Sequence, residues 1–381
     1  MNACVAWGYG VSYLSGYGFS AGVLGTMFAL FALGAAVAQP LIGRIIDRSK
    51  RFHWKWVLLF LTIITLILIA SLLFIRNRYM VAVIFCLYSM TINITMSLIN
   101  VVCVYYEHHG KDMNFGVARG IGSLTYAVLS VLIGQLIAPL GMQVVLYAGI
   151  IVALFTVLCT ASFPYLGPTP TVGGEQPNPS EKKNALALIA KYPAFFLMVV
   201  AVALFLTFQN MSSNYMVLIL EAVGGDHRDL GIVLSLAAVL EIPIMFLTGF
   251  MLRHFKAWWL MTFSGVLYAV RGVLYYFAGS VTAIYLLQIL QPFTYAILVS
   301  VQVFFSDQCM EPEDLATGQA FMGTAQAVGA TLGFFLGGVS IDRSGVSSML
   351  LFATVLSAIG AFLAAVSAIV CSKKENKAKG K

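Results

Sequence analysis

Long apolar segments alternate with short polar connections along the whole chain. Apolar residues dominate twelve segments, at 1–14, 20–46, 54–75, 79–106, 117–138, 143–165, 193–220, 229–252, 257–278, 281–305, 316–341 and 347–371. About 20 apolar residues cross a bilayer, so all but the first are long enough. Backbone groups in lipid must be satisfied internally, so we expect helices and not strands. Because Met1 to Leu14 is too short for a span, we expect a truncated or misassigned first helix.

The longest polar stretch, Leu166 to Pro193, separates six segments from six. Its Pro, Gly and Lys content is typical of a flexible linker. We therefore expect an N-terminal six-helix bundle at 1–165, a linker at 166–192, a C-terminal six-helix bundle at 193–371 and a basic tail at 372–381. Residues 185–190 predict a short surface helix before the seventh span.

Lysine and arginine are distributed unequally between the two sides of the predicted membrane protein. With the linker inside the cell and the connections alternating, the inner side holds Arg44, Arg48, Lys50, Arg51, Lys55, Lys111, Lys182, Lys183, Lys191, Arg253, Lys256 and five tail lysines. The outer side holds Arg76, Arg78, Arg228 and Arg343. Cytoplasmic loops carry the excess of basic residues, so both termini are expected in the cytoplasm. The net charge of +7 then reflects topology and not a nucleic-acid partner.

Composition agrees with a multi-pass protein of the cell membrane, which would be the inner membrane of a Gram-negative cell. The chain is 60% hydrophobic and 10% charged, whereas soluble domains carry about 25% charged residues. No Gly-rich phosphate loop, nucleophile elbow or metal-ligand cluster occurs in the sequence. We therefore expect no enzymatic activity, no cofactor and no bound metal. The six cysteines show no disulfide or metal spacing, which predicts small core residues.

The two halves resemble each other in glycine spacing. Gly25 and Gly43 are 18 positions apart in the second segment, and Gly231 and Gly249 repeat that spacing in the eighth. A long internal repeat of this kind fits two pseudo-symmetric halves of a transporter. Arg253 stands where the second half would repeat Asp47.

Three ionisable residues fall inside apolar segments: Glu241, Arg271 and Arg119. A lone charge at the bilayer centre costs at least about 2.5–3.5 kcal/mol, so each needs a partner, a wet cavity or neutralisation. Glu241 is a candidate proton carrier or substrate acceptor, and the alternative is a structural ion pair with Arg271. Arg119 lies near the inner surface, where it either meets substrate or extends its head group to the interface.

Uncharged polar residues recur in the same segments. The amides Gln209, Asn210, Asn214, Gln291 and Gln326 offer both donors and acceptors to a hydroxyl-rich or amide-bearing ligand. The alternative for each is a hydrogen bond between helices. Tyr126 offers an aromatic face for stacking.

The stretch Gly43-Arg44-Ile45-Ile46-Asp47-Arg48-Ser49-Lys50-Arg51 resembles the loop 2–3 signature of the major facilitator superfamily. The chain further resembles the lactose-permease-like branch of oligosaccharide:proton symporters. Phe115-Gly116-Val117-Ala118-Arg119 is similar to the sugar-binding motif of that branch, and Tyr126 stands near its stacking position. Arg271 is similar in placement to an arginine of its proton site. Gln291 and Thr294 replace the His and Glu of its proton relay, which argues against galactoside specificity.

The resemblance implies an all-α integral membrane protein with twelve transmembrane helices in two six-helix bundles, acting as a monomer. It implies proton-coupled uptake of a small polar solute, such as a sugar or nucleoside, by alternating access. Glu241 and Arg271 would then carry proton coupling, and the five amides, Arg119 and Tyr126 would bind substrate. Gly43, Asp47, Arg48 and Arg51 would form the inner gate. Proton-coupled export of drugs or metabolites is one alternative, and a non-transporting sensor or inactive paralogue is another.

Overall fold

The computed structural model describes residues 1–48, 54–109, 115–167 and 185–379, and within them it is helical without strands. Ten of the described helices are long and apolar enough to cross a membrane. The last of them, Thr317–Glu375, contains both final predicted spans. The prediction of an all-α membrane protein is therefore confirmed.

The chain divides into two compact units, each described by itself below. Unit 1 comprises Met1–Val172 and Asn214–Ala238, and unit 2 comprises Gly173–Ser213 and Val239–Lys381. The predicted bundle boundaries differ from this division, because residues 214–238 were expected in the C-terminal bundle. The predicted boundaries of the two six-helix bundles therefore remain a prediction.

Unit 1 contains five long helices and several short ones. Its elements are a π-helix at Cys4–Gly8, α1 (Gly10–Ser15), α2 (Ala21–Arg48), α3 (Trp54–Ser71), α4 (Arg78–His108), α5 (Phe115–Leu140), α6 (Gln143–Ser162), α9 (Met216–Ala222) and the first part of α10 (His227–His254). The first predicted segment is present as the π-helix and α1, and Cys4, Val5 and Leu14 in it are fully buried.

The core of unit 1 includes an aromatic cluster between α2, α3 and α4. Trp54 at the start of α3 packs edge-on against Tyr105 of α4, with ring centroids 4.9 Å apart. The hydroxyls of Tyr105 and Tyr106 donate to the carbonyls of Gly167 and Pro164, at 2.8 and 2.6 Å. These bonds fix the chain after α6 to the end of α4.

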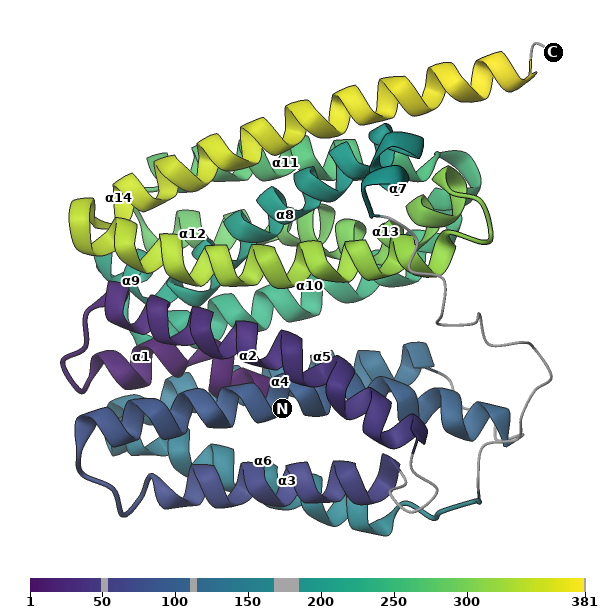
Figure 1. Ribbon diagram of the computed structural model, residues 1–381. Helices are drawn as coiled ribbons and strands as arrows, with labels where there is room; N and C mark the ends of the chain where they lie inside the picture. The colour runs from purple at the N-terminus through teal and green to yellow at the C-terminus, as the bar shows by residue number, and fades with distance from the viewer. Residues whose placement is uncertain (49–53, 110–114, 168–184, 380–381) are drawn as a thin grey trace. The chain divides into compact units, whose positions relative to one another are not determined.

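Unit 2 contains the other helices. They are α7 (Ala185–Lys191), α8 (Pro193–Asn214), the rest of α10, α11 (Ala257–Phe277), α12 (Val281–Leu287), a 3₁₀ turn at Gln288–Leu290, a π-helix at Pro292–Ala296, α13 (Ile297–Cys309) and α14 (Leu315–Lys379). The short helix α7 confirms the surface helix predicted at 185–190. Figure 1 shows α14 as two runs joined by a sharp turn.

That turn lies at Gly345, where φ is 81° and ψ is 176°. A positive φ is available to glycine at low cost because glycine has no Cβ. The turn therefore separates the two spans predicted at 316–341 and 347–371. The predicted break at Gly279-Ser280 is also confirmed, because α11 ends at Phe277 and the Ser280 hydroxyl accepts from the amide of Ala283 to cap α12.

Two predicted spans are less regular than expected. The segment 193–220 is broken at Tyr215, between α8 and α9, where φ is −101° and ψ is 17°. The segment 281–305 changes from α-helix through a 3₁₀ turn to a π-helix before α13 begins. Pro292 accounts for the second irregularity, because proline has no amide hydrogen to donate within a helix.

Large apolar side chains are exposed along nearly every long helix. Examples are Leu30 of α2, Phe60 of α3, Ile151 of α6 and Phe362 of α14. Soluble proteins rarely expose contiguous apolar surface on this scale. Helices that are apolar on their outer faces instead fit a hydrocarbon solvent, so the chain is a multi-pass membrane protein.

Candidate functional site

The most buried cation described in unit 2 is Arg271, in the middle of α11. Its side chain is 1% exposed. One terminal nitrogen, Nη1, donates to Gln209 Oε1 at 3.2 Å and to Thr294 Oγ1 at 3.4 Å. The other, Nη2, donates to the Tyr275 hydroxyl at 3.0 Å and to Gln288 Oε1 at 3.5 Å. Four neutral oxygens on three segments thus surround one guanidinium group.

Tyr275 supports this cation in two ways. The ring of Tyr275 lies 5.2 Å from the guanidinium carbon of Arg271, within the range of a cation–π contact. The Tyr275 hydroxyl also accepts from Gln288 Nε2 at 2.8 Å. A buried charge is costly unless hydrogen bonds compensate it, which explains why several polar groups converge on the two terminal nitrogens of Arg271.

A chain of hydrogen bonds leads from Arg271 to Glu241. Arg271 donates to Gln209, Gln209 Nε2 lies 3.5 Å from Gln291 Oε1, and Gln291 Nε2 donates to Glu241 Oε1 at 2.8 Å. Every amide points the same way, with its NH₂ group toward the carboxylate. The two predicted charged residues are therefore linked through two glutamines that were predicted as substrate ligands.

The glutamines lie where unit 2 departs from regular α-helix. Gln288 begins the 3₁₀ turn and Gln291 directly precedes the π-helix Pro292–Ala296. π-Helical turns occur often at functional sites because they shift side chains out of α-helical register. Here the irregular stretch presents Gln288 and Thr294 to Arg271, and it presents Gln291 to Gln209 and Glu241.

Other predicted ligands are placed differently. Asn210, also on α8, donates from Nδ2 to the carbonyl of Leu206 at 2.8 Å. Asn214 is 7% exposed at the end of α8 and belongs to unit 1. Gln326 of α14 is exposed. None of these contacts tests substrate binding, so the three roles stay predictions.

The predicted residues of the N-terminal half are described less fully. Tyr126 of α5 is half-buried, and its hydroxyl lies against Gly8. Arg119 is in α5, and Gly43, Asp47 and Arg48 are in the last part of α2, but only the helical assignment of these four residues is described. Arg51 lies outside the described residues altogether.

Three members of the cluster, Tyr275, Gln288 and Thr294, were not among the predicted site residues. Tyr275 lies four positions after Arg271, which places both side chains on the same face of α11. Thr294 lies three positions after Gln291, and it had been noted only as a replacement for a family glutamate. Gln288 lies three positions before Gln291, so a search for polar residues at helical spacing from Arg271 and Gln291 would have found all three.

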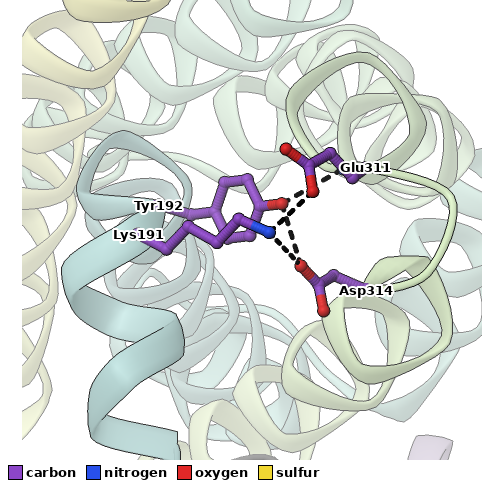
Figure 2. A network of polar contacts seen from close by, with 4 residues as sticks. All are labelled: Lys191, Tyr192, Glu311 and Asp314. Atoms are coloured by element: carbon purple, nitrogen blue, oxygen red, sulfur yellow. Dashed lines mark hydrogen bonds and ion pairs between the residues drawn. The ribbon is translucent and has the colours of Figure 1, made fainter.

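A second polar network ties α7 to the connection between α13 and α14 (Figure 2). Lys191 Nζ lies 2.7 Å from Glu311 Oε2 and 2.9 Å from Asp314 Oδ2. The Tyr192 hydroxyl donates to the same Asp314 oxygen at 2.9 Å. The hydrogen bonds to Glu311 and then to Asp314 raise the pKa of Lys191 above its ordinary value, because they stabilise the charged ammonium group. The network anchors the end of the linker to unit 2.

Among the described residues, no group of three or more His, Cys, Asp or Glu side chains is arranged to hold a metal ion. The chemistry of the Arg271 cluster is that of donors, acceptors and one ionisable carboxyl group. Such a set can bind a polar molecule through hydrogen bonds and carry a proton on the carboxyl group.

Comparison with solved structures finds the same fold. A mutant of the nucleoside transporter NupG is 16% identical and matches with a TM-score of 0.76, covering 98% of this chain and 95% of that chain. A bacterial homologue of the human lysosomal transporter Spinster, inward-facing and unoccupied, is 15% identical with a TM-score of 0.68, covering 98% and 94%. No curated protein sequence gives a significant match.

The family model described as "MFS_1 like family" matches residues 7–353, which is most of the chain. The expected superfamily is therefore confirmed, while the lactose-permease-like branch remains a prediction. The chain belongs to the MFS_1-like family and is a multi-pass, non-enzymatic membrane transporter of the major facilitator type.

Proposed function

We propose that this transporter takes up a small polar solute of the nucleoside or sugar type together with protons. The hydrogen-bonded chain from Arg271 through Gln209 and Gln291 to Glu241 carries this proposal. It joins the ionisable carboxyl group to amides that suit a polar solute. Transporters of this build place substrate and coupling-ion sites near the bilayer midplane.

The orientation of the hydrogen bonds in this chain suggests how protonation of Glu241 would change the positions of the two amide groups. An ionised carboxylate only accepts hydrogen bonds, and it matches the NH₂ group that Gln291 presents to Glu241. A protonated Glu241 also donates, which favours the opposite orientation of the Gln291 amide. Turning that amide would remove the acceptor that Gln291 offers to Gln209, and so disturb the contact between Gln209 and Arg271.

The position of Glu241 within a membrane-spanning helix makes its negative charge costly, so we expect the carboxyl group to take part in proton exchange. Glu241 is half-buried in α10, and Arg271 at the other end of the chain is fully buried. Charged groups within a membrane are costly and usually mark ion or substrate pathways. In this proposal Glu241 loads the proton, and Arg271 polarises the amides between them.

The solute class follows from the amides. Gln209 and Gln291 each carry two donors and one acceptor oxygen, which complement the hydroxyl and amide groups of sugars and nucleosides. NupG, which has the same fold, is a nucleoside transporter, so nucleosides head the solutes to test. Asn210, Asn214, Gln326, Arg119 and Tyr126 remain candidate ligands. Gly43, Asp47, Arg48 and Arg51 remain the candidate inner gate.

The test is uptake by proteoliposomes containing the purified full-length protein. Radiolabelled nucleosides, sugars and aromatic acids are supplied with the outside more acidic than the inside, and again after an ionophore collapses the gradient. We expect one solute class to accumulate above equilibrium only with the gradient. Efflux of solute against its gradient would instead support the exporter alternative. Failure of every solute to cross would favour a sensor or inactive protein.

Two carboxyl variants locate the coupling. Glu241→Gln keeps the shape and removes the titratable group, and we expect it to exchange solute without accumulating it. Glu221→Gln is the matched control, because Glu221 is exposed at the end of α9. Equal accumulation by wild type and Glu241→Gln would contradict the assignment of Glu241 as the proton carrier.

A further inference from the structure

Two cysteines far apart in sequence meet in unit 2. Cys309 is the last residue of α13, and Cys371 lies in the final part of α14. Their sulfur atoms are 3.6 Å apart and both thiols are free. Both side chains are partly exposed, whereas Cys4 and Cys86 are buried. The spacing of 62 positions gave no sign of this pair in the sequence.

We propose that Cys309 and Cys371 form a reversible dithiol modification site that low-molecular-weight disulfides oxidise. A disulfide bond is about 2.05 Å long, so the sulfurs must approach by roughly 1.5 Å. Cys309 is the last residue of α13, where the backbone leaves the helix and can adjust, and Cys371 lies eight residues before the end of α14. Partial exposure allows a reagent to reach one sulfur before the other closes the bond.

The chemistry balances with glutathione disulfide as the oxidant. The thiolate of one cysteine attacks a glutathione sulfur, forming a mixed disulfide and releasing one glutathione thiolate. The second cysteine thiolate then attacks the protein sulfur of that mixed disulfide and releases the other glutathione. Two electrons pass from the protein thiols to glutathione disulfide, and the two thiol protons end on the two released glutathiones.

The position of the pair gives oxidation a structural consequence. Cys309 directly precedes the connection that carries Glu311 and Asp314, the two acidic partners of Lys191. Cys371 lies three residues before Lys374, whose Nζ is 5.9 Å from the ring centroid of Tyr192. A disulfide would therefore join α13 and α14 a few residues from the network, drawn in Figure 2, that anchors α7.

Thiol counting tests the proposal on the full-length protein. All variants carry Cys159→Ser, because Cys159 is exposed and could react independently. The purified protein is treated with glutathione disulfide, unfolded in detergent and labelled with a maleimide polymer that adds one mass step per thiol. Of the six cysteines, five remain in this background, and we expect three labels after oxidation. Dithiothreitol should restore five.

Variants at the pair give the decisive comparison. With Cys309→Ser or Cys371→Ser added, no disulfide can form between the two positions, so oxidation should remove at most one label. An antibody to glutathione should then detect the mixed disulfide trapped on the remaining cysteine. Five labels in the treated background protein would overturn the proposal. So would the loss of two labels in the Cys309→Ser protein, or glutathione retained on both thiols in the background protein.

Discussion

At the residue scale, a single buried guanidinium group organises the polar part of unit 2. Arg271 is held by Gln209, Thr294, Tyr275 and Gln288, and Gln209 connects it toward Glu241. If the predicted lactose-permease-like resemblance holds, Gln291 and Thr294 stand where that branch carries His and Glu. Both replacements take part in this cluster, so the neutral side chains retain a polar role around Arg271 and Glu241.

Removing one hydroxyl from the cluster should destabilise the protein. In Tyr275→Phe, the donors of Arg271 and Gln288 lose their common acceptor inside a buried site. An unsatisfied buried donor costs about 1–3 kcal/mol. We expect a lower melting temperature in detergent, measured by a fluorescence thermal shift. Tyr276→Phe is the control, because Tyr276 is exposed and adjacent. Equal melting temperatures for the two variants would mean that the Tyr275 hydroxyl contributes little.

The acidic partners of Lys191 should differ in importance. Asp314 is 3% exposed and accepts from both Lys191 and Tyr192, whereas the side chain of Glu311 is 62% exposed. Exposed ion pairs contribute little because water and salt screen them. We expect Asp314→Asn to lower the melting temperature clearly and Glu311→Gln to leave it almost unchanged. A larger fall in melting temperature for Glu311→Gln than for Asp314→Asn would show that the exposed ion pair contributes more to the stability of this network.

At the element scale, the way α8 packs against α14 explains part of the fold. Gly329 and Gly333 are four positions apart on α14, a spacing that lets membrane helices approach closely. A Cβ at Gly329 would lie 2.8 Å from the Ala203 carbonyl oxygen, and one at Gly333 would lie 2.5 Å from the Cβ of Asn210. This contact brings α8, which carries Gln209, into its place in unit 2.

The close contact gives a direct prediction. Gly329→Ala should force α8 and α14 apart and destabilise the protein by about 1–3 kcal/mol, as overpacked sites do. Gly323→Ala on the same helix meets nothing within 4 Å and is the matched control. Because alanine favours helix over glycine, the control should be neutral or slightly stabilised. Thermal unfolding of both proteins checks this, and an equally stable Gly329→Ala protein would contradict the packing argument.

The sequence predicts helices and their ends more fully than it predicts the site. Long apolar segments reveal spans because lipid demands them, and Gly279-Ser280 marks a turn by composition. The π-helix after Gln291 and the break at Tyr215 were not predicted, since each depends on local backbone geometry within an apolar segment. Glu241 and Arg271 were found because charge is rare in lipid. The hydrogen-bonded link between Glu241 and Arg271 through Gln209 and Gln291 was not predicted, because predicting it requires knowing which helix faces pack together.

At the scale of the whole molecule, basic residues predict how the chain is oriented. The predicted inner side carries sixteen Lys and Arg residues against four outside, counted from the sequence. Alkaline phosphatase is active only outside the cytoplasm, whereas green fluorescent protein matures inside it. We expect fluorescence from a fusion after Lys381 and phosphatase activity from a fusion after Arg343. Phosphatase activity at the C-terminus would reverse the orientation.

The central claim is that Glu241 carries a proton with the solute. Its most direct test is the pH of a weakly buffered medium around proteoliposomes when the transported solute is added without an imposed gradient. The wild type should make the medium more alkaline in proportion to solute entry, and Glu241→Gln should admit solute with no pH change. The same proton uptake per solute in both proteins would contradict the account.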